Sequence, residues 1–160
     1  MAVEFNQLVA EAVHPLEAGT PGAADIDGSW VSLKKFDRLA VVLCADAAAE
    51  AITVTLTQAQ DASGTGAKAL TVDVAWVKDS GETAFTMTRY DGAATAVLPA
   101  GDTSDVAAMI VETMGEKLDV TNGFTHVKAV TTGVTARVIS LTYLLTGGRY
   151  QPAAEVDPNG

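Results

Sequence analysis

The sequence predicts an all-β protein, a two-sheet antiparallel β-sandwich with jelly-roll or immunoglobulin-like topology. From Ser29 onward the apolar residues recur at every second position, as in residues 52–56, where Ile, Val and Leu alternate with Thr. Short runs of this kind are separated by turn signals at the spacing that is typical of sandwiches and barrels. The outward positions are rich in Thr, and β-branched residues suit a pleated, half-solvated surface. Because no long helical segment separates the strands, a βαβ fold is not expected.

The strands are expected from the alternation and from the turn residues between them. Their ranges are 29–35, 38–45, 51–59, 69–77, 83–90, 96–98, 106–115, 124–130 and 135–145, with a helix as the alternative for 106–115. The run 38–45 is apolar at successive positions, which predicts a central strand that is covered on both faces. Its residue Cys44, the single cysteine, is expected to be a small buried core residue and excludes an internal disulfide. Asp91-Gly92 predicts a hairpin turn and Asn122-Gly123 a turn.

The ends of the chain differ from its middle in composition. Residues 1–28 are expected to form an N-terminal arm, because their last ten residues are Gly-, Pro- and Asp-rich and have no periodicity. The apolar spacing within 3–13 permits a short helix, which Pro15 would end. Residues 29–146 are expected to be the sandwich domain, and residues 147–160 an extended C-terminal tail.

Composition and charge limit the classes of partner that the protein is expected to bind. The chain has 160 residues, 10 Lys and Arg against 20 Asp and Glu, and a net charge of −10. An excess of acid opposes binding to nucleic acid, because that affinity comes largely from neutralising phosphates. It also opposes binding to an anionic membrane surface. The N-terminus does not have the pattern of a secretory signal, and no apolar run approaches the roughly 20 residues of a membrane span.

The search for catalytic and ligand-binding motifs predicts no catalytic residue, no cofactor site and no metal site, and therefore no enzyme. The histidines His14 and His126 are not clustered with cysteines at zinc-ligand spacing, and each is expected to have a structural or surface role. The segment 61–68 has some likeness to a phosphate-binding loop, but its spacing is G-x-G-x-K and a strand follows it. We therefore expect a corner, where glycine supplies positive φ. The acidic segments 25–28 and 101–105 are interpreted as turns, because no EF-hand spacing is present. For Asp102 and Asp105 the other interpretation is a contact at the rim of an interface.

The two tryptophans, Trp30 and Trp76, both lie on alternating segments. Core packing is one interpretation. The other is a stacking platform for a sugar or for a partner side chain, since an aromatic ring presents a large flat surface.

Three segments of the chain resemble small virion proteins that are encoded among the head genes of tailed bacteriophages and prophages. The first runs from residue 29 through the alternating strand and its glycine loop to residue 70. The second surrounds Asn122-Gly123, and the third is the end of the last strand with the Arg149-Tyr150 pair that follows it. The matching positions are Val31, Ser32, Leu33, Lys34, Phe36, Arg38, Leu56, Gln58, Ala59, Asp61, Ala62, Gly64, Gly66, Lys68, Ala69, Leu70, Leu118, Asp119, Val120, Asn122, Gly123, Phe124, Arg149 and Tyr150. Phe36 stands where the family often has Tyr.

The resemblance implies a structural virion protein, a capsid decoration (cement) protein that binds the major capsid protein and stabilises the head. It implies a homo-oligomer, with a trimer favoured, on the capsid surface of a virion assembled in the host bacterial cytoplasm. The arm and tail would be ordered by neighbouring subunits. The residues expected in that interface are Phe5, Leu8, Val9, Val13, Leu16, Arg149 and Tyr150. Two alternatives stay open: a tail, head–tail junction or fibre-base protein, and a carbohydrate-binding or adhesin-like sandwich.

Overall fold

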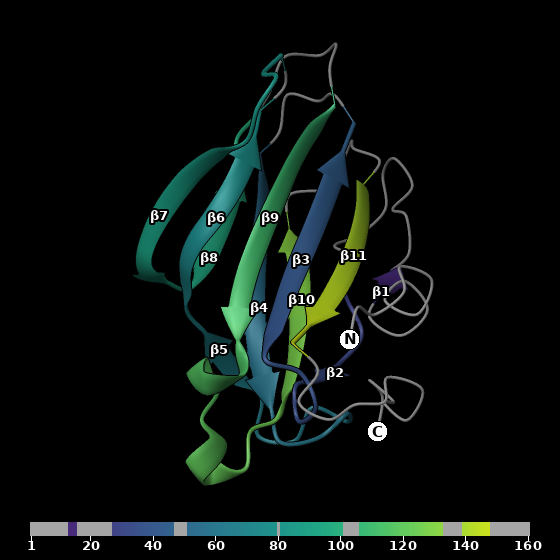
Figure 1. Ribbon diagram of the computed structural model, residues 1–160, viewed down its shortest axis with the longest axis vertical. Helices are drawn as coiled ribbons and strands as arrows, with labels where there is room; N and C mark the ends of the chain where they lie inside the picture. The colour runs from purple at the N-terminus through teal and green to yellow at the C-terminus, as the bar shows by residue number, and fades with distance from the viewer. Residues whose placement is uncertain are drawn as a thin grey trace.

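The computed structural model describes residues 13–15, 27–46, 51–79, 81–100, 106–132 and 139–147, and these form two antiparallel sheets (Figure 1). The strands are β1 (Val13–Pro15), β2 (Val31–Ser32), β3 (Arg38–Ala45), β4 (Ile52–Ala59), β5 (Lys68–Leu70), β6 (Val72–Lys78), β7 (Thr86–Ala93), β8 (Thr95–Leu98), β9 (Ala107–Met114), β10 (His126–Thr132) and β11 (Ile139–Thr146). Two single turns of 3₁₀-helix, η1 (Gly115–Lys117) and η2 (Val120–Asn122), lie between β9 and β10. The predicted all-β, two-sheet fold is confirmed.

The strand order defines the two layers. Sheet A has six strands in the order β1-β11-β3-β9-β6-β7. Sheet B has five strands: its main path is β2-β10-β4-β5, and β8 also pairs with β4. In Figure 1 sheet A lies in front, and β4 and β10 of sheet B lie behind it.

The core lies between the two sheets and follows the alternation in the sequence. In β3, β4, β9, β10 and β11 every second residue is buried, and these side chains come from both sheets. The inward set includes Leu39, Val41, Leu43, Ile52, Val54, Leu56, Ile139, Leu141, Tyr143 and Leu145. Burying an aliphatic side chain of this size stabilises a fold by roughly 1.5–3 kcal/mol, so the alternation is the main reason why the two layers associate.

The prediction that residues 38–45 are covered on both faces is wrong. Strand β3 is central in sheet A, but only its inward face is fully buried. The outward residues Ala40, Val42 and Cys44 are half-buried. The sequence predicts that Cys44 is a core residue, but Cys44 lies on the outer face of sheet A. The prediction failed because the outward residues of β3 are also apolar. The sequence therefore resembles that of a strand covered on both faces, whereas the two-layer sandwich covers only one face.

The prediction that Asp91-Gly92 forms a hairpin turn is also wrong. Both residues have positive φ, 46° and 77°, but they lie within β7. There the register against β6 shifts, because Val74 pairs with Arg89 whereas Val72 pairs with Ala93. The dipeptide therefore forms a β-bulge, a feature that bends and twists a strand. The chain then leaves sheet A, since the next strand, β8, pairs with β4 of sheet B.

Two short pieces of the segment expected as the arm pair with the sheets. Residues Val13 to Pro15 pair antiparallel with Leu144 to Thr142 and place β1 at the edge of sheet A. An edge is where a sheet tolerates proline, which has no N–H to donate to a ladder. Asp27 forms an isolated bridge with Val130. Val13, the last residue of the helix expected in 3–13, begins β1 instead, and the rest of that segment lies outside the described residues.

Two tyrosines connect the sheets, one near each open side of the sandwich. Tyr143 of β11 is fully buried, and its hydroxyl accepts a hydrogen bond of 2.6 Å from the backbone N–H of Ala129 in β10. Tyr90 of β7 reaches β8, where its hydroxyl accepts from the N–H of Val97 and donates to the carbonyl of the same residue, both at 3.0 Å. Each bond joins a strand of sheet A to a strand of sheet B.

Replacing Tyr143 should destabilise the protein more than replacing Tyr90. In Tyr143→Phe the buried N–H of Ala129 loses its partner, and such a group costs about 1–3 kcal/mol. In Tyr90→Phe the N–H and carbonyl of the exposed Val97 can bond to water instead, so we expect the free energy of unfolding to fall by less than about 1 kcal/mol. Urea unfolding of both variants measures the difference, and equal losses would contradict the distinct role of Tyr143.

The stability should also fall at alkaline pH because of Tyr143. Burial raises the pKa of this hydroxyl well above its usual value. As pH rises above about 10, tyrosine in the unfolded chain releases its proton while folded Tyr143 retains it. The stabilisation is therefore complete below about pH 10 and is lost above it, by up to about 1.4 kcal/mol per pH unit. Unfolding free energies from pH 9 to 12 should fall less steeply for Tyr143→Phe, and identical slopes would refute the assignment.

Candidate interaction surfaces

Several residues of the two internal motif segments meet at one end of the sandwich. The Lys68 ammonium lies 2.5 Å from the Asp119 carboxylate, although the two residues are 51 positions apart in the sequence. The side-chain amide of Asn122 donates to both oxygens of the same carboxylate, at 3.0 and 2.8 Å. Gln58 accepts a hydrogen bond from the backbone N–H of Asp119, and Gln60 donates to the carbonyl of Asn122, each at 2.9 Å. The two motif segments therefore form one structural unit.

The charges of this end are arranged around Asp119. Its bond to Lys68, followed by its bond to Asn122, holds the pKa of the carboxyl below its usual value. The Lys68 ammonium also lies 4.2 Å from the centroid of the Phe124 ring. Asp119, Asn122 and Phe124 all belong to the segment that surrounds η2, so Lys68 attaches that segment to the start of β5.

The glycine loop between β4 and β5 is a corner, as the sequence predicts. The Asp61 carboxylate accepts hydrogen bonds from the N–H groups of Ser63 and Thr65, at 2.9 and 3.1 Å. Bonds from Thr65 are the main reason why the pKa of Asp61 lies below its usual value. The N–H groups of Gly64 and Ala67 bond to carbonyls within the same loop. Backbone donors that a phosphate would need are thus already used to close the turn.

Trp30 packs against this corner instead of forming a platform. Gly64 has a φ of +82°, and a Cβ at this position would lie 3.0 Å from the Trp30 indole nitrogen. The Lys128 ammonium lies 5.5 Å from the centroid of the same ring and 3.2 Å from the Asp27 carboxylate. The close approach of the indole to the backbone explains why a glycine stands at position 64.

His126 has the structural role that the sequence predicts. The residue is buried, and its Nδ1 lies 3.0 Å from the hydroxyl of Thr125. Desolvation is the main cause that lowers the pKa of the imidazole below its usual value. The side chain of His14 lies outside the described part. Within the described ranges, no group of three His, Cys, Asp or Glu residues could hold a metal ion.

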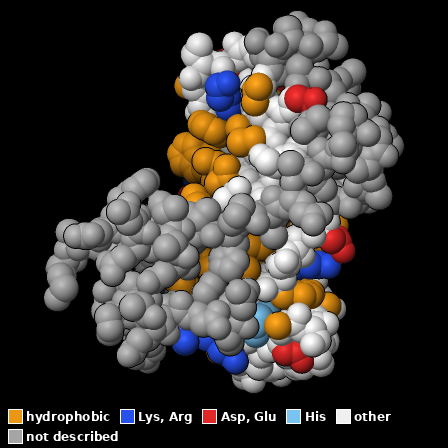
Figure 2. Space-filling model, turned by 90° about the vertical axis from the view of Figure 1, so that its right-hand side faces the viewer, with side chains coloured by type: hydrophobic (Ala, Val, Ile, Leu, Met, Phe, Trp, Pro, Cys, Tyr) orange, Lys and Arg blue, Asp and Glu red, His pale blue; other side chains and the backbone are white. Residues whose placement is uncertain are grey.

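The outer face of sheet A carries an exposed apolar row. Adjacent strands place Val42, Ile110, Trp76 and Met87 side by side, from β3 to β7. Trp76 is 39% exposed and Met87 46% exposed. Figure 2 views the molecule from the β11 side and shows hydrophobic side chains gathered toward its left, the side of sheet A. We call these four residues the outer apolar row, and such a surface is typical of an interaction site.

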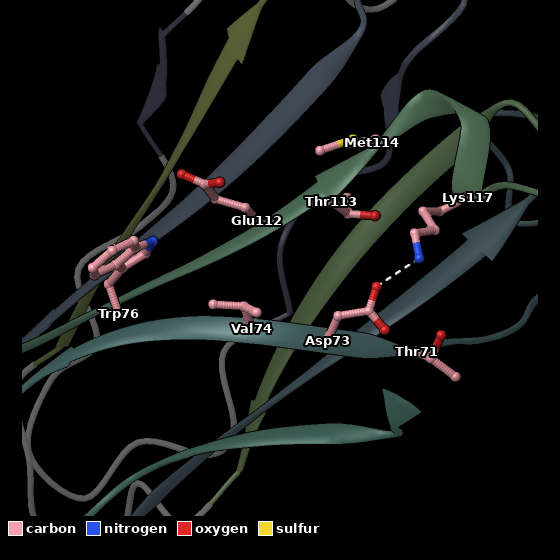
Figure 3. A pocket seen from close by; sticks show the side chains of 8 residues that line it. All are labelled: Thr71, Asp73, Val74, Trp76, Glu112, Thr113, Met114 and Lys117. Carbon is pink, nitrogen blue, oxygen red and sulfur yellow. Dashed lines mark hydrogen bonds and ion pairs between the residues drawn. The ribbon is translucent and has the colours of Figure 1, made fainter. Parts of the chain in front are cut away.

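A cleft opens at the edge of this row, between β6 and β9 (Figure 3). Its volume is about 310 Å³. The lining residues are Thr71, Asp73, Val74, Trp76, Glu112, Thr113, Met114 and Lys117. Lys117 of η1 closes one end through an ion pair of 2.6 Å with Asp73, and this bond raises the pKa of the lysine. We call this the β6–β9 cleft. Of its lining residues, only Trp76 could be singled out from the sequence.

The interface residues expected from the sequence fall mostly outside the described residues. These are Phe5, Leu8, Val9, Leu16, Arg149 and Tyr150. Val13 begins β1, and its backbone lies opposite Leu144 of β11. Strand β11 ends at Thr146, so the start of the expected tail and the β1 piece of the expected arm belong to one edge of sheet A.

Comparisons with known proteins place the chain in no family. No protein-family model and no curated protein sequence matches it. A crystal structure of the SPBc2 prophage-derived protein YomS is similar, with a TM-score of 0.45 and 12% identity over 84% of this chain and 91% of that chain. A structure of the infectious bursal disease virus Gt strain has a TM-score of 0.22 and 12% identity over 89% of this chain and 46% of that one. At this likeness neither protein's biology extends to the present chain. In the described residues no helix is long and apolar enough to cross a membrane.

The packing of the corner can be tested with two glycine variants. Gly123→Ala should cost about 1–2 kcal/mol, because φ is +82° there but nothing lies within 4 Å of the new Cβ. Gly64→Ala meets the Trp30 ring as well, and overpacking should add at least about 1 kcal/mol. Urea unfolding gives both values. If Gly64→Ala is no worse than Gly123→Ala, the contact with Trp30 does not constrain the corner.

Proposed function

We propose that the protein is a non-enzymatic structural component of a tailed-bacteriophage virion, a capsid decoration protein that binds the major capsid protein and stabilises the head. The proposal starts from the resemblance of its motifs to small head proteins of such phages. The observation that carries it is the network of Lys68, Asp119 and Asn122, through which the two motif segments form one hydrogen-bonded end of the sandwich. Residues that match a family at scattered positions thus share one structural role.

The molecule offers a contact surface that suits this role. The outer apolar row would gain burial when sheet A is placed against a capsid. The arm and tail would extend this contact, because the β1 piece and the end of β11 lie on one edge of the same sheet. An extended segment can join a neighbouring subunit by adding a strand to its sheet. The interface residues expected in the arm and tail would then contact the capsid.

The charge of the chain suits a protein that is stored free and then assembled. A net charge of −10 keeps free copies apart in the host cytoplasm until they meet the capsid. We place the assembled protein on the capsid exterior, as a homo-oligomer for which a trimer is favoured by the resemblance. A position at the tail, the head–tail junction or a fibre base would use the same kind of surface.

One observation favours a second candidate function, the carbohydrate-binding sandwich. Trp76 is partly exposed beside the β6–β9 cleft, where Glu112 and Asp73 supply carboxylates. An exposed ring with polar neighbours can stack on a sugar and bond its hydroxyl groups. Trp30 does not contribute to such a site, because it packs against Gly64.

The decoration role predicts binding to undecorated capsids of the parent phage. The wild-type protein should co-sediment with them and raise their melting temperature. Ile110→Asp, in the middle of the outer apolar row, should weaken binding at least about tenfold, a change of about 1.4 kcal/mol. Thr132→Asp is the matched control, because Thr132 is an exposed residue of sheet B and should bind as wild type does.

Thermal unfolding of the free variants checks that each is folded before its binding is compared. The proposal fails if the wild-type protein neither co-sediments with the capsids nor shifts their melting temperature. If Thr132→Asp loses binding as Ile110→Asp does, the contact surface is not the outer face of sheet A.

A further inference from the structure

The β6–β9 cleft exists because two neighbouring strands separate. The paired register of β6 and β9 ends at Ala75 and Val111, although β6 begins at Val72 and β9 continues to Met114. The bulge in β7 lies beside the same part of β6, since the register shift falls between Val72 and Val74. A bulge increases the local twist of a sheet, so the end of the β6–β9 pairing coincides with a locally distorted part of sheet A. The cleft is therefore part of the sheet architecture.

The wall of the cleft holds a buried hydroxyl without a hydrogen-bond partner. Thr113 is 6% exposed, and its Oγ1 has no hydrogen-bond partner among the residues that the structure describes. The residue lines the cleft between Glu112 and Met114. Buried hydroxyls in native proteins are nearly always bonded, because leaving one unpaired costs free energy. This atom is therefore the kind of group that a ligand entering the cleft would satisfy.

The charges of the cleft select a cationic ligand. Two carboxylates, Asp73 and Glu112, line it together with one cation, Lys117. Lys117 is bonded to Asp73, while Glu112 makes no ion pair with any residue in the described part of the chain. Among the lining residues one negative charge thus remains, and it lies on the same outer face as the Trp76 ring; Arg89 of β7, which pairs with Val74, does not line the cleft. A neutral sugar would leave the Glu112 charge uncompensated. A cation beside the ring would be attracted by both the Glu112 carboxylate and the Trp76 ring.

We propose that the β6–β9 cleft binds an arginine side chain that an extended peptide segment of the partner protein presents. A guanidinium is planar and weakly hydrated, so it can stack on Trp76 while it pairs with Glu112. It has five N–H donors, so donors that Glu112 does not use would be available to the Thr113 hydroxyl, which lines the same cleft. Apolar residues beside the arginine would pack on Val74 and Met114. The identification of the partner as a capsid protein rests on the proposed function, but the chemistry of the cleft does not.

The test uses the full chain and a defined peptide, the acetylated and amidated tripeptide Leu-Arg-Leu, in an NMR titration. The Trp76 indole N–H and the backbone amides of Glu112 and Thr113 should shift saturably. Trp30→Phe identifies which indole signal belongs to Trp76. The peptide in which citrulline replaces arginine has the same shape without the charge, and it should bind at least about tenfold more weakly.

Variants of the cleft separate the contributions. Glu112→Gln and Thr113→Val should each weaken binding of the arginine peptide at least about fivefold. Glu116→Gln is the matched control, because Glu116 is exposed in η1 and does not line the cleft, and it should leave the affinity unchanged. Thr113→Val should also melt no lower than wild type, since it removes an unpaired buried hydroxyl.

The inference is overturned if the citrulline peptide binds as tightly as the arginine peptide, or if Glu112→Gln leaves the affinity unchanged. It is also overturned if maltotriose shifts the Trp76 signal and the arginine peptide does not, which would favour the carbohydrate-binding function. Capsid co-sedimentation is scored separately. Wild-type protein that binds capsids but not the peptide contradicts only the arginine site, and the opposite result contradicts only the decoration role.

Discussion

Two tyrosines that bond across the layers, one near each side of the sandwich, are the constraint that fixes how the two sheets lie on each other. The hydrophobic core holds the sheets together but does not fix their relative position, because burial has no direction. The Tyr143–Ala129 and Tyr90–Val97 bonds are directional, and they join strands of sheet A to strands of sheet B. Their effect is to fix sheet A over sheet B, so that the outward side chains of sheet A form a surface of defined shape.

The parts of the fold that depend on local periodicity could be predicted from the sequence. The alternation of β4 gave its strand and its buried face, and the glycine loop after it is the expected corner. The strand expected at 69–77 is divided at Thr71, between β5 and β6, because its halves pair in different sheets. The errors at Cys44 and Asp91-Gly92 have a similar origin. Local sequence shows which residues favour a strand or positive φ, but not how many layers cover a strand or which sheet it joins next.

The candidate site could be predicted only in part, for the same reason. Trp76 was recognisable from its size and its place in an alternating segment. The β6–β9 cleft was not, because it arises where a register ends and where η1 brings Lys117 to Asp73, 44 residues away in the sequence. The orphan hydroxyl of Thr113 likewise has no local signature. Lys68, Asp119 and Asn122, by contrast, stand out in the sequence through the resemblance to phage head proteins, and the structure shows that the three residues contact one another.

The central claim is that this sandwich serves as a structural clamp on a virus head and uses the outer face of sheet A and the edge formed by β1 and β11. An electron-microscopy reconstruction of the virion tests it most directly. The account predicts density for the sandwich on the outside of the head, with the outer apolar row against the major capsid protein. Density at the tail, or a sandwich bound to the head through sheet B, would contradict it. So would a virion that contains no copy of the protein.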